Sequence, residues 1–397
     1  MKKYRIIFHV DLNAFFASCE MAENKDLKNI PLGIGPTSDR GILTTANYEA
    51  RKYGVTSAMP LQEARRLCPK LKVLPTNFEL YKKYSGYFFD YLRSYTDKLE
   101  PASIDEGYLD MSEATKDKHP VEVAQQIQND LLERYDLPVS IGIAPNMFLA
   151  KMASDMKKPK GITVLRKRDV KEKLWPLPIE DLHGIGRKTV PNLKLLGIET
   201  IGDLATFKDQ KKLRAFLGNA TDSFIKKVHG EDERVLDPSR QEKHQSIGNS
   251  KTFEGFLHEY QEMVEALEQL TKRVSERLKE KDLACKTITV QMRTAQYENH
   301  SKAFTMEYHT NNFYAMMEEV EHLFDSLYKT DEPVHLLGVS ASSLEKTKQL
   351  FKQLTIYEVD QTKDRSQEIS SLLKSINSQY GKRLLKKGTD DNNDQDL

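Results

Sequence analysis

Three acidic residues, Asp11, Asp105 and Glu106, have the types and positions needed for metal-assisted phosphoryl transfer. Asp11 follows the short apolar run 6–10, which predicts a buried strand. Asp105 and Glu106 lie between two further alternating segments and so occupy the tip of a predicted hairpin. Mg²⁺ binds carboxylate oxygens, and two such ions can clamp the attacking and leaving oxygens of a phosphoryl group. On spacing alone, an aspartate after a strand and an acidic hairpin tip are more often ordinary turn residues.

The segments around these residues alternate between strand and helix patterns. This order indicates an α+β fold built on a sheet. The predicted strands are 6–10, 101–104, 108–111, 139–143 and 161–165, and the predicted helices are 13–21, 79–97, 120–135 and 146–156. Residues 24–78, with a strand at 41–45 and helices at 47–53 and 60–67, look inserted into this layer.

The C-terminal half has a second and cleaner alternation. Residues 168–232 are helical with short turns, and the polar segment 233–244 has no periodicity, which predicts a linker. Beyond it, the order β-α-β-β-α-β indicates a split-βαβ domain. Its predicted strands are 245–253, 286–293, 302–308 and 334–341, and its predicted helices are 259–281 and 312–328.

Composition excludes several classes of protein. A length of 397 residues allows about two to four domains. No apolar run approaches the ~18 residues of a membrane span, and the N-terminus has no signal peptide pattern. The three cysteines are far apart, which excludes a disulfide framework and fits a reducing cytoplasm. The balance of 60 basic and 59 acidic residues excludes a polybasic protein but still allows a local basic groove.

Four sequence blocks resemble the signature motifs of Y-family translesion DNA polymerases, most closely the bacterial members. They are HVDLNAFFASCE (9–20), TTANYEARKYGV (44–55), SIDEGYLDM (103–111) and GIAPNMFLAKMASDMKKPKG (142–161). Their order and spacing agree with the family over about residues 4–357. The resemblance implies a template-directed DNA polymerase of low fidelity and low processivity that bypasses damaged template bases.

The resemblance also implies a multidomain right-hand architecture. A palm with a mixed sheet would carry the reaction, and small fingers, a helical thumb and a split-βαβ little finger would surround the DNA. The implied divisions are 1–23 and 79–167 for the palm, 24–78 for the fingers, 168–232 for the thumb, 233–244 for the linker, 245–352 for the little finger, and 353–397 for a clamp-binding peptide and tail.

The resemblance implies that the acidic residues bind two Mg²⁺ ions. Asp11, Asp105, Glu106 and the backbone carbonyl of Leu12 match the metal ligands of the family. Asn13 stands where the family often has Asp, but that side chain is not a ligand, so we expect activity to be retained.

Phe16 matches the steric gate, a flat ring beneath the sugar that leaves no room for a 2′-OH and so selects deoxynucleotides by exclusion. The alternative is a core position on an apolar helix face, which we accept for Phe15.

Four residues match those that hold the incoming deoxynucleoside triphosphate. Tyr48, Arg51 and Lys158 are the main contacts and Thr45 is a lesser one. Basic side chains neutralise phosphate charge as it moves to the leaving pyrophosphate. Outside this block, a YxxR pair on a helix is more often a solvated face.

Contacts with primer–template DNA are predicted in two places. The run HGIGRK (183–188) resembles a helix-hairpin-helix near 183–197, in which Gly184 and Gly186 free the backbone to meet a phosphate and Lys188 adds charge. The alternative is a simple turn between helices. In the little finger, Lys251 with its neighbours Ser250 and Thr252 is a candidate phosphate contact, as are Lys286 and Arg293; a solvated strand face is the alternative.

The fourth block departs from the family at one position. Met147 stands where Lys is common, which removes one charge available to the DNA backbone. Lys151, one helical turn later, is expected to compensate.

Near the C-terminus, Gln353, Leu354, Ile356 and Tyr357 resemble the peptide with which bacterial polymerases dock on the sliding clamp. A final packing strand is the alternative.

We therefore expect a monomeric cytoplasmic enzyme that uses deoxynucleoside triphosphates, primer–template DNA and the sliding clamp. Two alternative functions from other classes of protein remain. A nucleotide cyclase places two carboxylates on a similar sheet but would not need a helix-hairpin-helix. A non-catalytic DNA-binding scaffold would not need all three metal carboxylates.

Overall fold

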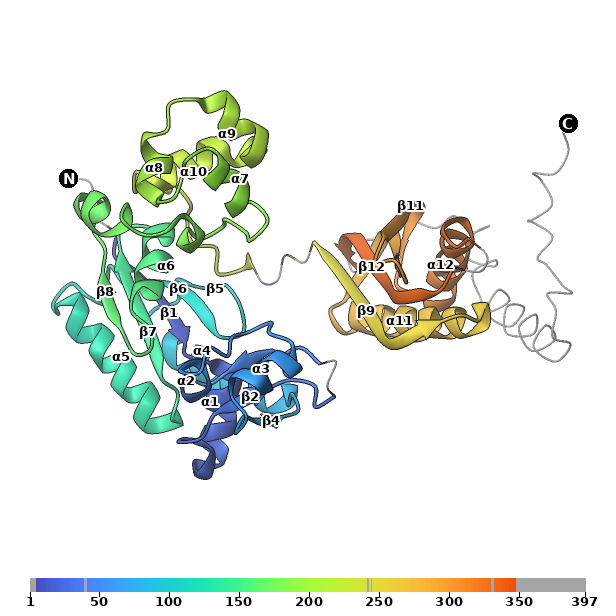
Figure 1. Ribbon diagram of the computed structural model, residues 1–397, viewed down its shortest axis with the longest axis horizontal. Coiled ribbons are helices and arrows are strands. Elements are labelled where there is room, and N and C mark those ends of the chain that lie inside the picture. Colours follow the sequence, from blue (N-terminus) through green and yellow to red (C-terminus); the bar gives the residue numbers. More distant parts are fainter. Residues whose placement is uncertain (1–4, 39–40, 241–242, 244, 330–331, 348–397) are drawn as a thin grey trace, which may run out of the picture. The chain divides into compact units, whose positions relative to one another are not determined.

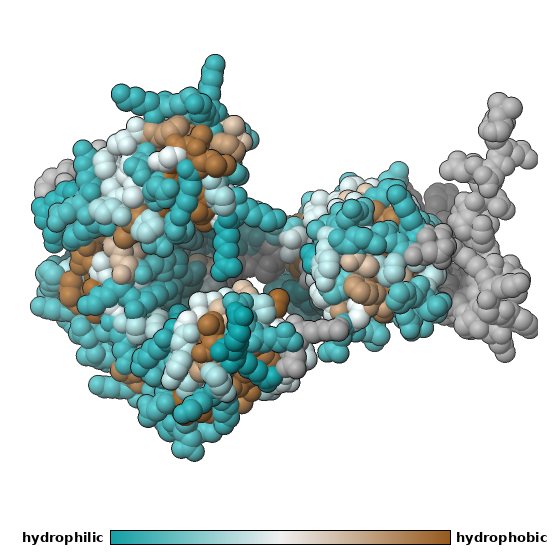
Figure 2. All heavy atoms as spheres, in the orientation of Figure 1, coloured by the Kyte–Doolittle hydropathy of each residue, from teal (hydrophilic) through white to brown (hydrophobic). Residues whose placement is uncertain are grey.

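The computed structural model describes residues 5–38, 41–240, 243, 245–329 and 332–347. The chain forms two compact units, Met1–Lys243 and His244–Leu397 (Figure 1), and each is described by itself. The predicted clamp peptide at 353–357 lies outside the described residues. Hydrophilic residues cover most of the surface visible in Figure 2. Within the described part of the chain, no helix is both long and apolar enough to cross a membrane.

A five-stranded sheet forms the centre of the first unit. Its order is β5-β6-β1-β7-β8, so β1 lies in the middle, antiparallel to both neighbours. The strands are β1 (Ile7–Leu12), β5 (Leu99–Pro101), β6 (Glu106–Asp110), β7 (Val139–Ala144) and β8 (Ile162–Val164). Every residue of β1 is buried, because helices cover both faces of the sheet.

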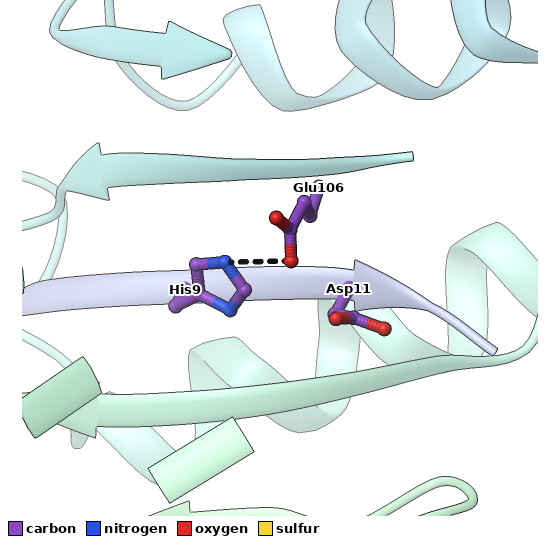
Figure 3. A group of neighbouring side chains, drawn as sticks. All are labelled: His9, Asp11 and Glu106. Carbon is purple, nitrogen blue, oxygen red and sulfur yellow. Dashed lines mark ion pairs between the residues drawn. The ribbon is translucent and has the colours of Figure 1, made fainter. Parts of the chain in front are cut away.

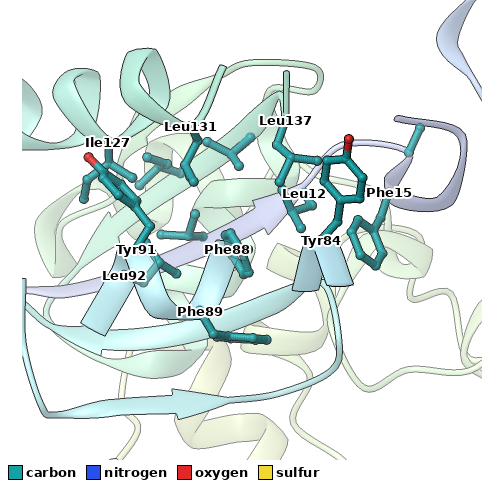
Figure 4. Close-up of a cluster of buried hydrophobic side chains, with 14 of the residues drawn as sticks. Leu12, Phe15, Tyr84, Phe88, Phe89, Tyr91, Leu92, Ile127, Leu131 and Leu137 are labelled. Carbon is teal, nitrogen blue, oxygen red and sulfur yellow. The ribbon is translucent and has the colours of Figure 1, made fainter. Parts of the chain in front are cut away.

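The two faces of β1 belong to different hydrophobic clusters. Phe8, Val10 and Leu12 join the cluster of α1 (Phe15–Glu23), α4 (Phe78–Arg93) and α5 (Pro120–Tyr135), part of which is drawn in Figure 4. Ile7 joins the cluster around α6 (Met147–Met156). Because side chains alternate along a strand, His9 and Asp11 lie on the same face as Ile7, toward α6.

The inserted segment forms a small sheet of its own, in the order β3-β2-β4. Its elements are β2 (Leu32–Ile34), β3 (Thr45–Ala46), α2 (Tyr48–Arg51), α3 (Leu61–Leu67) and β4 (Lys72–Leu74), and Lys25–Leu27 forms a 3-10 turn. The predicted strand at 41–45 is wrong. Only Thr45–Ala46 is a strand, and Ile42 makes an isolated bridge to Pro60. Strands of two or three residues are too short to leave a periodic pattern.

Short helices follow the sheet, as predicted for 168–232. They are α7 (Val190–Leu195), α8 (Ile201–Thr206), α9 (Gln210–Leu217) and α10 (Thr221–Val228), with single turns at Lys167–Asp169, Val170–Leu174, Ile179–Asp181 and Gly218–Ala220. The segment after α10 is tied to the sheet. The Asp232 carboxylate accepts the Phe148 N–H (2.9 Å), and the buried Glu100 carboxylate accepts the Asp237 N–H (2.8 Å).

The second unit is one antiparallel sheet with two helices, and the predicted β-α-β-β-α-β order is confirmed. The sheet order is β11-β10-β12-β9, so each helix connects strands separated by one other strand. The elements are β9 (Ser246–Leu257), α11 (Tyr260–Glu280), β10 (Leu283–Thr294), β11 (Asn299–Thr310), α12 (Phe313–Leu327) and β12 (Val334–Lys346). The helices and the inward side chains of the sheet share one core.

Candidate active site

The register of the central strands brings the predicted acidic residues to one end of the sheet. Asp11 pairs with Glu106 across β1 and β6, and the Leu12 N–H donates to the Asp105 carbonyl at 2.9 Å. Figure 3 shows the side chains of His9, Asp11 and Glu106 grouped over β1. One ligand atom from each of these three lies within 4.8 Å of the others. Antiparallel pairing therefore places carboxylates about 95 positions apart in the chain side by side.

Ser103 shapes the turn that carries Asp105. Its hydroxyl oxygen accepts the N–H groups of Asp105 (3.2 Å) and Glu106 (3.1 Å), and its O–H donates to the Asp105 carboxylate. The predicted strand at 101–104 is therefore misplaced: β5 covers Leu99–Pro101 and the backbone turns after Pro101. Glu106 is the first residue of β6 and not a hairpin tip. Burial raises the pKa of the Asp105 carboxyl above its usual range; the bond from Ser103 opposes this shift, and the charges of Asp11 and Glu106 add to it.

Two lysines neutralise the acidic cluster. Lys158 Nζ lies 2.8 Å from Asp11 Oδ1 and 2.9 Å from Asp155 Oδ1. Lys151 Nζ lies 2.6 Å from Glu106 Oε2 and 3.2 Å from Asp11 Oδ2. Burial alone would raise the pKa of the Glu106 carboxyl, but the contacts with His9 and Lys151 hold that pKa well below its usual range. Glu106 is thus ready to act as an anionic ligand.

A cavity of about 360 Å³ opens beside these carboxylates. It brings together Asp11, Leu12 and Asp105 with all five residues predicted to bind the nucleotide: Phe16, Thr45, Tyr48, Arg51 and Lys158. Asn13 also contributes to the wall, but its amide is buried and engaged, since Oδ1 accepts the Lys160 N–H (2.8 Å) and Nδ2 donates to Ser140 Oγ (3.0 Å). Its side chain therefore holds the loop before β8 by hydrogen bonds, as expected for a position that is not a metal ligand.

The Phe16 ring lies in the wall of this cavity and has a fixed orientation. It stacks on Tyr81 with a centroid distance of 4.1 Å and an interplanar angle of 9°. The Tyr81 hydroxyl in turn donates to the Glu20 carboxylate at 2.9 Å. Phe15, in contrast, is 3% exposed and belongs to the hydrophobic core, as predicted. Neighbouring phenylalanines on one helix thus have different surroundings: Phe15 is buried in the core, and the less buried ring of Phe16 stacks in parallel on Tyr81.

Tyr48 and Arg51 also line the cavity and lie on α2 of the inserted segment. The Arg51 guanidinium carbon lies 4.7 Å from the centre of the Tyr48 ring, and Arg51 Nε donates to the Ala46 carbonyl at 3.0 Å. The Tyr48 hydroxyl is buried and has no hydrogen-bond partner among the described residues. A buried hydroxyl without a partner costs free energy. This hydroxyl therefore marks a place where a polar ligand group would be bound.

Several residues of the site were not predicted from the sequence. His9, Ser103, Lys151 and Asp155 touch the acidic cluster, and Ser57 lines the cavity. A periodic signal existed for some of them. His9 is two positions before Asp11 on a strand, and Lys151 and Asp155 are four apart on a helix. Nothing in the spacing of Ser57 indicated its position.

Two expectations about α6 are wrong. Met147 is 1% exposed, so its side chain belongs to the core and does not lie on a DNA-facing surface. Lys151 does not compensate for a lost surface charge, because its ammonium is buried against Asp11 and Glu106. Both side chains point inward since the covered face of this helix includes nearly every residue from Met147 to Ser154.

The predicted glycine hairpin is a surface turn. Gly184, Gly186 and Lys188 are exposed on either side of Ile185, which is buried. Gly184 has a φ of 99°, a conformation that favours glycine, and an added Cβ would lie 3.3 Å from the Phe224 ring. A Cβ added to Gly186 would meet no atom within 4 Å. The Gly186 carbonyl accepts the Thr189 N–H just before α7.

Two neighbouring residues of β9 that were both predicted to contact DNA lie on opposite faces of the sheet. Ser250 pairs with Gly338, and Lys251 pairs with Leu337, which is buried under the helices. Alternation therefore places Lys251 on the helix side of the sheet, where its ammonium lies 5.5 Å from the Phe253 ring. Ser250 lies on the opposite, outer face.

Comparisons with known proteins account for this arrangement. Residues 10–155 match the impB/mucB/samB family, residues 244–356 match its C-terminal domain, and residues 167–198 match the HHH motif of the IMS family. The chain is 40% identical to DNA polymerase IV 1 of Bacillus subtilis (strain 168), over 97% of this chain and 93% of that protein. The chain belongs to the Y family of DNA polymerases. It is also 36% identical to DNA polymerase IV of Staphylococcus aureus (strain Mu50), over 89% of this chain and 99% of that protein.

Solved Y-family structures have the same fold. A Y-family DNA polymerase chimera of Dbh and Dpo4 matches with a TM-score of 0.75 and 26% identity, over 85% of this chain and 98% of that one. An insertion ternary complex of Dbh DNA polymerase matches with a TM-score of 0.62 and 27% identity over the same shares. The predicted α+β right-hand fold is thus confirmed. As a Y-family member, this is a DNA-directed DNA polymerase of the translesion class, and it depends on divalent metal ions.

Proposed function

We propose that this Y-family polymerase extends a primer 3′-OH with deoxynucleoside triphosphates at the carboxylate end of the five-stranded sheet. One observation carries the proposal: a single cavity is lined by Asp11, Leu12 and Asp105 and by five residues suited to a nucleotide. Asp11, Asp105, Glu106 and the Leu12 carbonyl would hold two Mg²⁺ ions. Such ions supply charge stabilisation for the attacking and leaving oxygens of phosphoryl transfer.

The chain's own residues prepare the substrate for this reaction. Arg51 and Lys158 both line the cavity, so their charges would hold the triphosphate and stabilise the leaving pyrophosphate. The Tyr48 hydroxyl would donate a hydrogen bond to a phosphate oxygen and thereby gain the partner that it lacks. Lys158 also contacts Asp11, which places the phosphate-binding charge next to a metal ligand.

The remaining assignments form part of the same proposal. Phe16 would act as the steric gate, and Thr45 as a minor nucleotide contact. Primer–template DNA would contact the hairpin with Gly184, Gly186 and Lys188 and the outer face of the four-stranded sheet, whereas Lys251, on the helix side of β9, would contribute little. The proposal also includes the domain boundaries given above. It further includes low fidelity and processivity, bypass of damaged bases, a monomeric state and a cytoplasmic location. Docking on the sliding clamp through Gln353, Leu354, Ile356 and Tyr357 is proposed from the sequence alone.

Primer extension tests this proposal. The full-length protein is incubated with a short primer–template, four deoxynucleoside triphosphates and Mg²⁺, beside Asp105→Asn and Asp110→Asn. Asp105 directly precedes β6 and lines the cavity. Asp110 is the last residue of β6, at the end remote from the cavity. We expect extension by the native protein and by Asp110→Asn, and none by Asp105→Asn. Binding of the duplex without any extension by the native protein would instead favour a scaffold and would refute the metal assignments.

A further inference from the structure

Lys151 is a charged side chain inside the acidic cluster that the proposed reaction does not use. Its side chain is 11% exposed, and its ammonium lies 2.6 Å from Glu106 Oε2 and 3.2 Å from Asp11 Oδ2. Asp155, on the next turn of α6, lies 3.4 Å from the same nitrogen. Three carboxylates from two strands and a helix therefore surround one buried cation.

The two lysines of the cluster have different positions. Lys158 lines the nucleotide cavity and contacts the Oδ1 atom of Asp11. Lys151 is not part of the cavity wall and contacts the other oxygen of the same carboxylate. Lys151 therefore reaches the carboxylates from the side of α6, outside the wall that would meet a nucleotide.

The position of Lys151 has an electrostatic consequence. Asp11 and Glu106 face each other across the strand pair, and without a cation between them their charges repel. A buried ammonium compensates this repulsion, and each carboxylate fixes one of its hydrogen-bond donors. A divalent cation bound by the same two carboxylates would lie a few ångströms from this ammonium and would be repelled by it.

We propose that Lys151 is a positioning residue that holds Asp11 and Glu106 in place for metal binding and at the same time weakens the affinity of the cluster for divalent cations. This inference rests on the proposed metal site. In the metal-free enzyme, the ammonium keeps the two carboxylates at the spacing set by β1 and β6. When a metal ion binds, the ammonium remains as an opposing charge, which favours release of the ion after each round of synthesis.

Binding of Mn²⁺ alone tests the proposal without any turnover. Free Mn²⁺ is measured by electron paramagnetic resonance as it is titrated into the full-length native protein, Lys151→Met, Lys151→Arg and Lys157→Met. We expect Lys151→Met to bind Mn²⁺ at least about tenfold more tightly, because even a strongly screened repulsion at a few ångströms exceeds this factor. Lys151→Arg keeps the charge and should stay within about threefold of the native protein.

Lys157→Met is the matched control. Lys157 is exposed just after α6, so its replacement removes one positive charge without touching Asp11 or Glu106. Its Mn²⁺ affinity should equal that of the native protein.

Thermal unfolding supplies the second measurement. Without metal, Lys151→Met should unfold at a lower temperature than the native protein, and saturating Mn²⁺ should remove most of that difference. If Lys151→Met does not fold, Lys151→Gln takes its place in both assays. Glutamine removes the same charge but keeps a side chain that can form hydrogen bonds.

Unchanged or weaker Mn²⁺ binding by a folded, uncharged variant would overturn the inference. Absence of Mn²⁺ binding by the native protein itself, together with absence of primer extension, would refute the proposed function instead. The two failures are therefore distinguishable.

Discussion

The two larger sheets of this polymerase carry their polar groups in opposite ways. At the end of the five-stranded sheet, the carboxyl groups of Asp11, Asp105 and Glu106 converge with two lysines, Lys151 and Lys158, and Asp11 and Lys151 are buried. The four-stranded sheet has helices on one face, and its other face is almost uncharged. The strand registers place on that outer face Ser246, Gly248, Ser250, Thr252, Thr287, Thr289, Gln291, Arg293, Asn299, Ser301, Ala303, Thr305, Leu336, Gly338, Ser340 and Ser342.

Contacts on this outer face support the assignment. Thr287 and Thr305 hydroxyls are 3.0 Å apart on neighbouring strands, and a Cβ added to Gly338 would meet the Gln291 side chain. None of these paired positions is Asp or Glu; the exposed Glu254 and Glu307 lie in the irregular parts of β9 and β11, beyond the paired register. Small neutral side chains allow a polyanion to approach closely without repulsion, whereas a reaction needs charges fixed at one point. The comparison thus separates a sheet face with few charges from a site where charges are concentrated, and the predictions below test whether the first meets DNA.

Removal of one carboxylate charge from the acidic cluster should have the largest effect of these changes, and the effect should be on the rate of primer extension. Asp11→Asn keeps the shape of the side chain but deprives Lys151 and Lys158 of a shared carboxylate. We expect the rate of primer extension to fall by at least about a thousandfold, since electrostatic stabilisation is commonly the largest single contribution to catalysis. Single-nucleotide incorporation measures the rate, and circular dichroism confirms folding. Retention of more than about a tenth of the native rate would contradict the role of Asp11.

The steric gate should give the next largest effect. Phe16→Ala removes the ring that stacks on Tyr81, and we expect discrimination against ribonucleotides to fall by about a hundredfold, because exclusion depends on that ring. Incorporation of matched deoxy- and ribonucleotides gives the ratio. Phe78→Ala is the control, since Phe78 contacts the Phe16 ring edge-on but does not line the cavity. Equal discrimination by native protein and Phe16→Ala would leave Phe16 a core residue.

A charge placed on the neutral sheet face should have a moderate effect. Ser340→Glu introduces an anion on the outer side of β12, and we expect duplex affinity to fall by about five- to tenfold at low salt, with a smaller difference at high salt. Gln269→Glu makes the same change of charge on the exposed side of α11, the helix that covers the other face. Fluorescence anisotropy at two salt concentrations compares them. Equal losses in both variants would mean that this sheet face has no special role.

The smallest effect should come from Lys251→Ala. Because Lys251 lies on the helix side of β9 above the Phe253 ring, its removal should change duplex affinity by less than about twofold. The same titration with Arg293→Ala, an outer-face cation, should give a larger loss. A fivefold loss for Lys251→Ala alone would show that its long side chain reaches the DNA around the edge of the sheet.

Long elements were predictable because they repeat a pattern over many residues. The helix at 120–135 and the β-α-β-β-α-β order of the second unit were found from periodicity, and four motif blocks indicated the family. The short strands of the inserted segment were missed (β2 and β4) or misplaced (β3), because two or three residues do not establish a period. The turn before Glu106 was misplaced since Ser103, by accepting two N–H groups, ends the strand earlier than alternation suggests.

The sequence by itself determined the identity of the acidic residues, the gate candidate Phe16 and the order of the elements. It could not determine the partners of those residues, because partners such as Lys151 and Ser103 are brought to the carboxylates by strand register and helix packing. Nor could it show that Lys251 and Ser250 lie on opposite faces, a distinction that depends on which face the helices cover. Residue types set the available chemistry, and only tertiary structure decides which charges lie within a few ångströms of each other, where their interaction is strong.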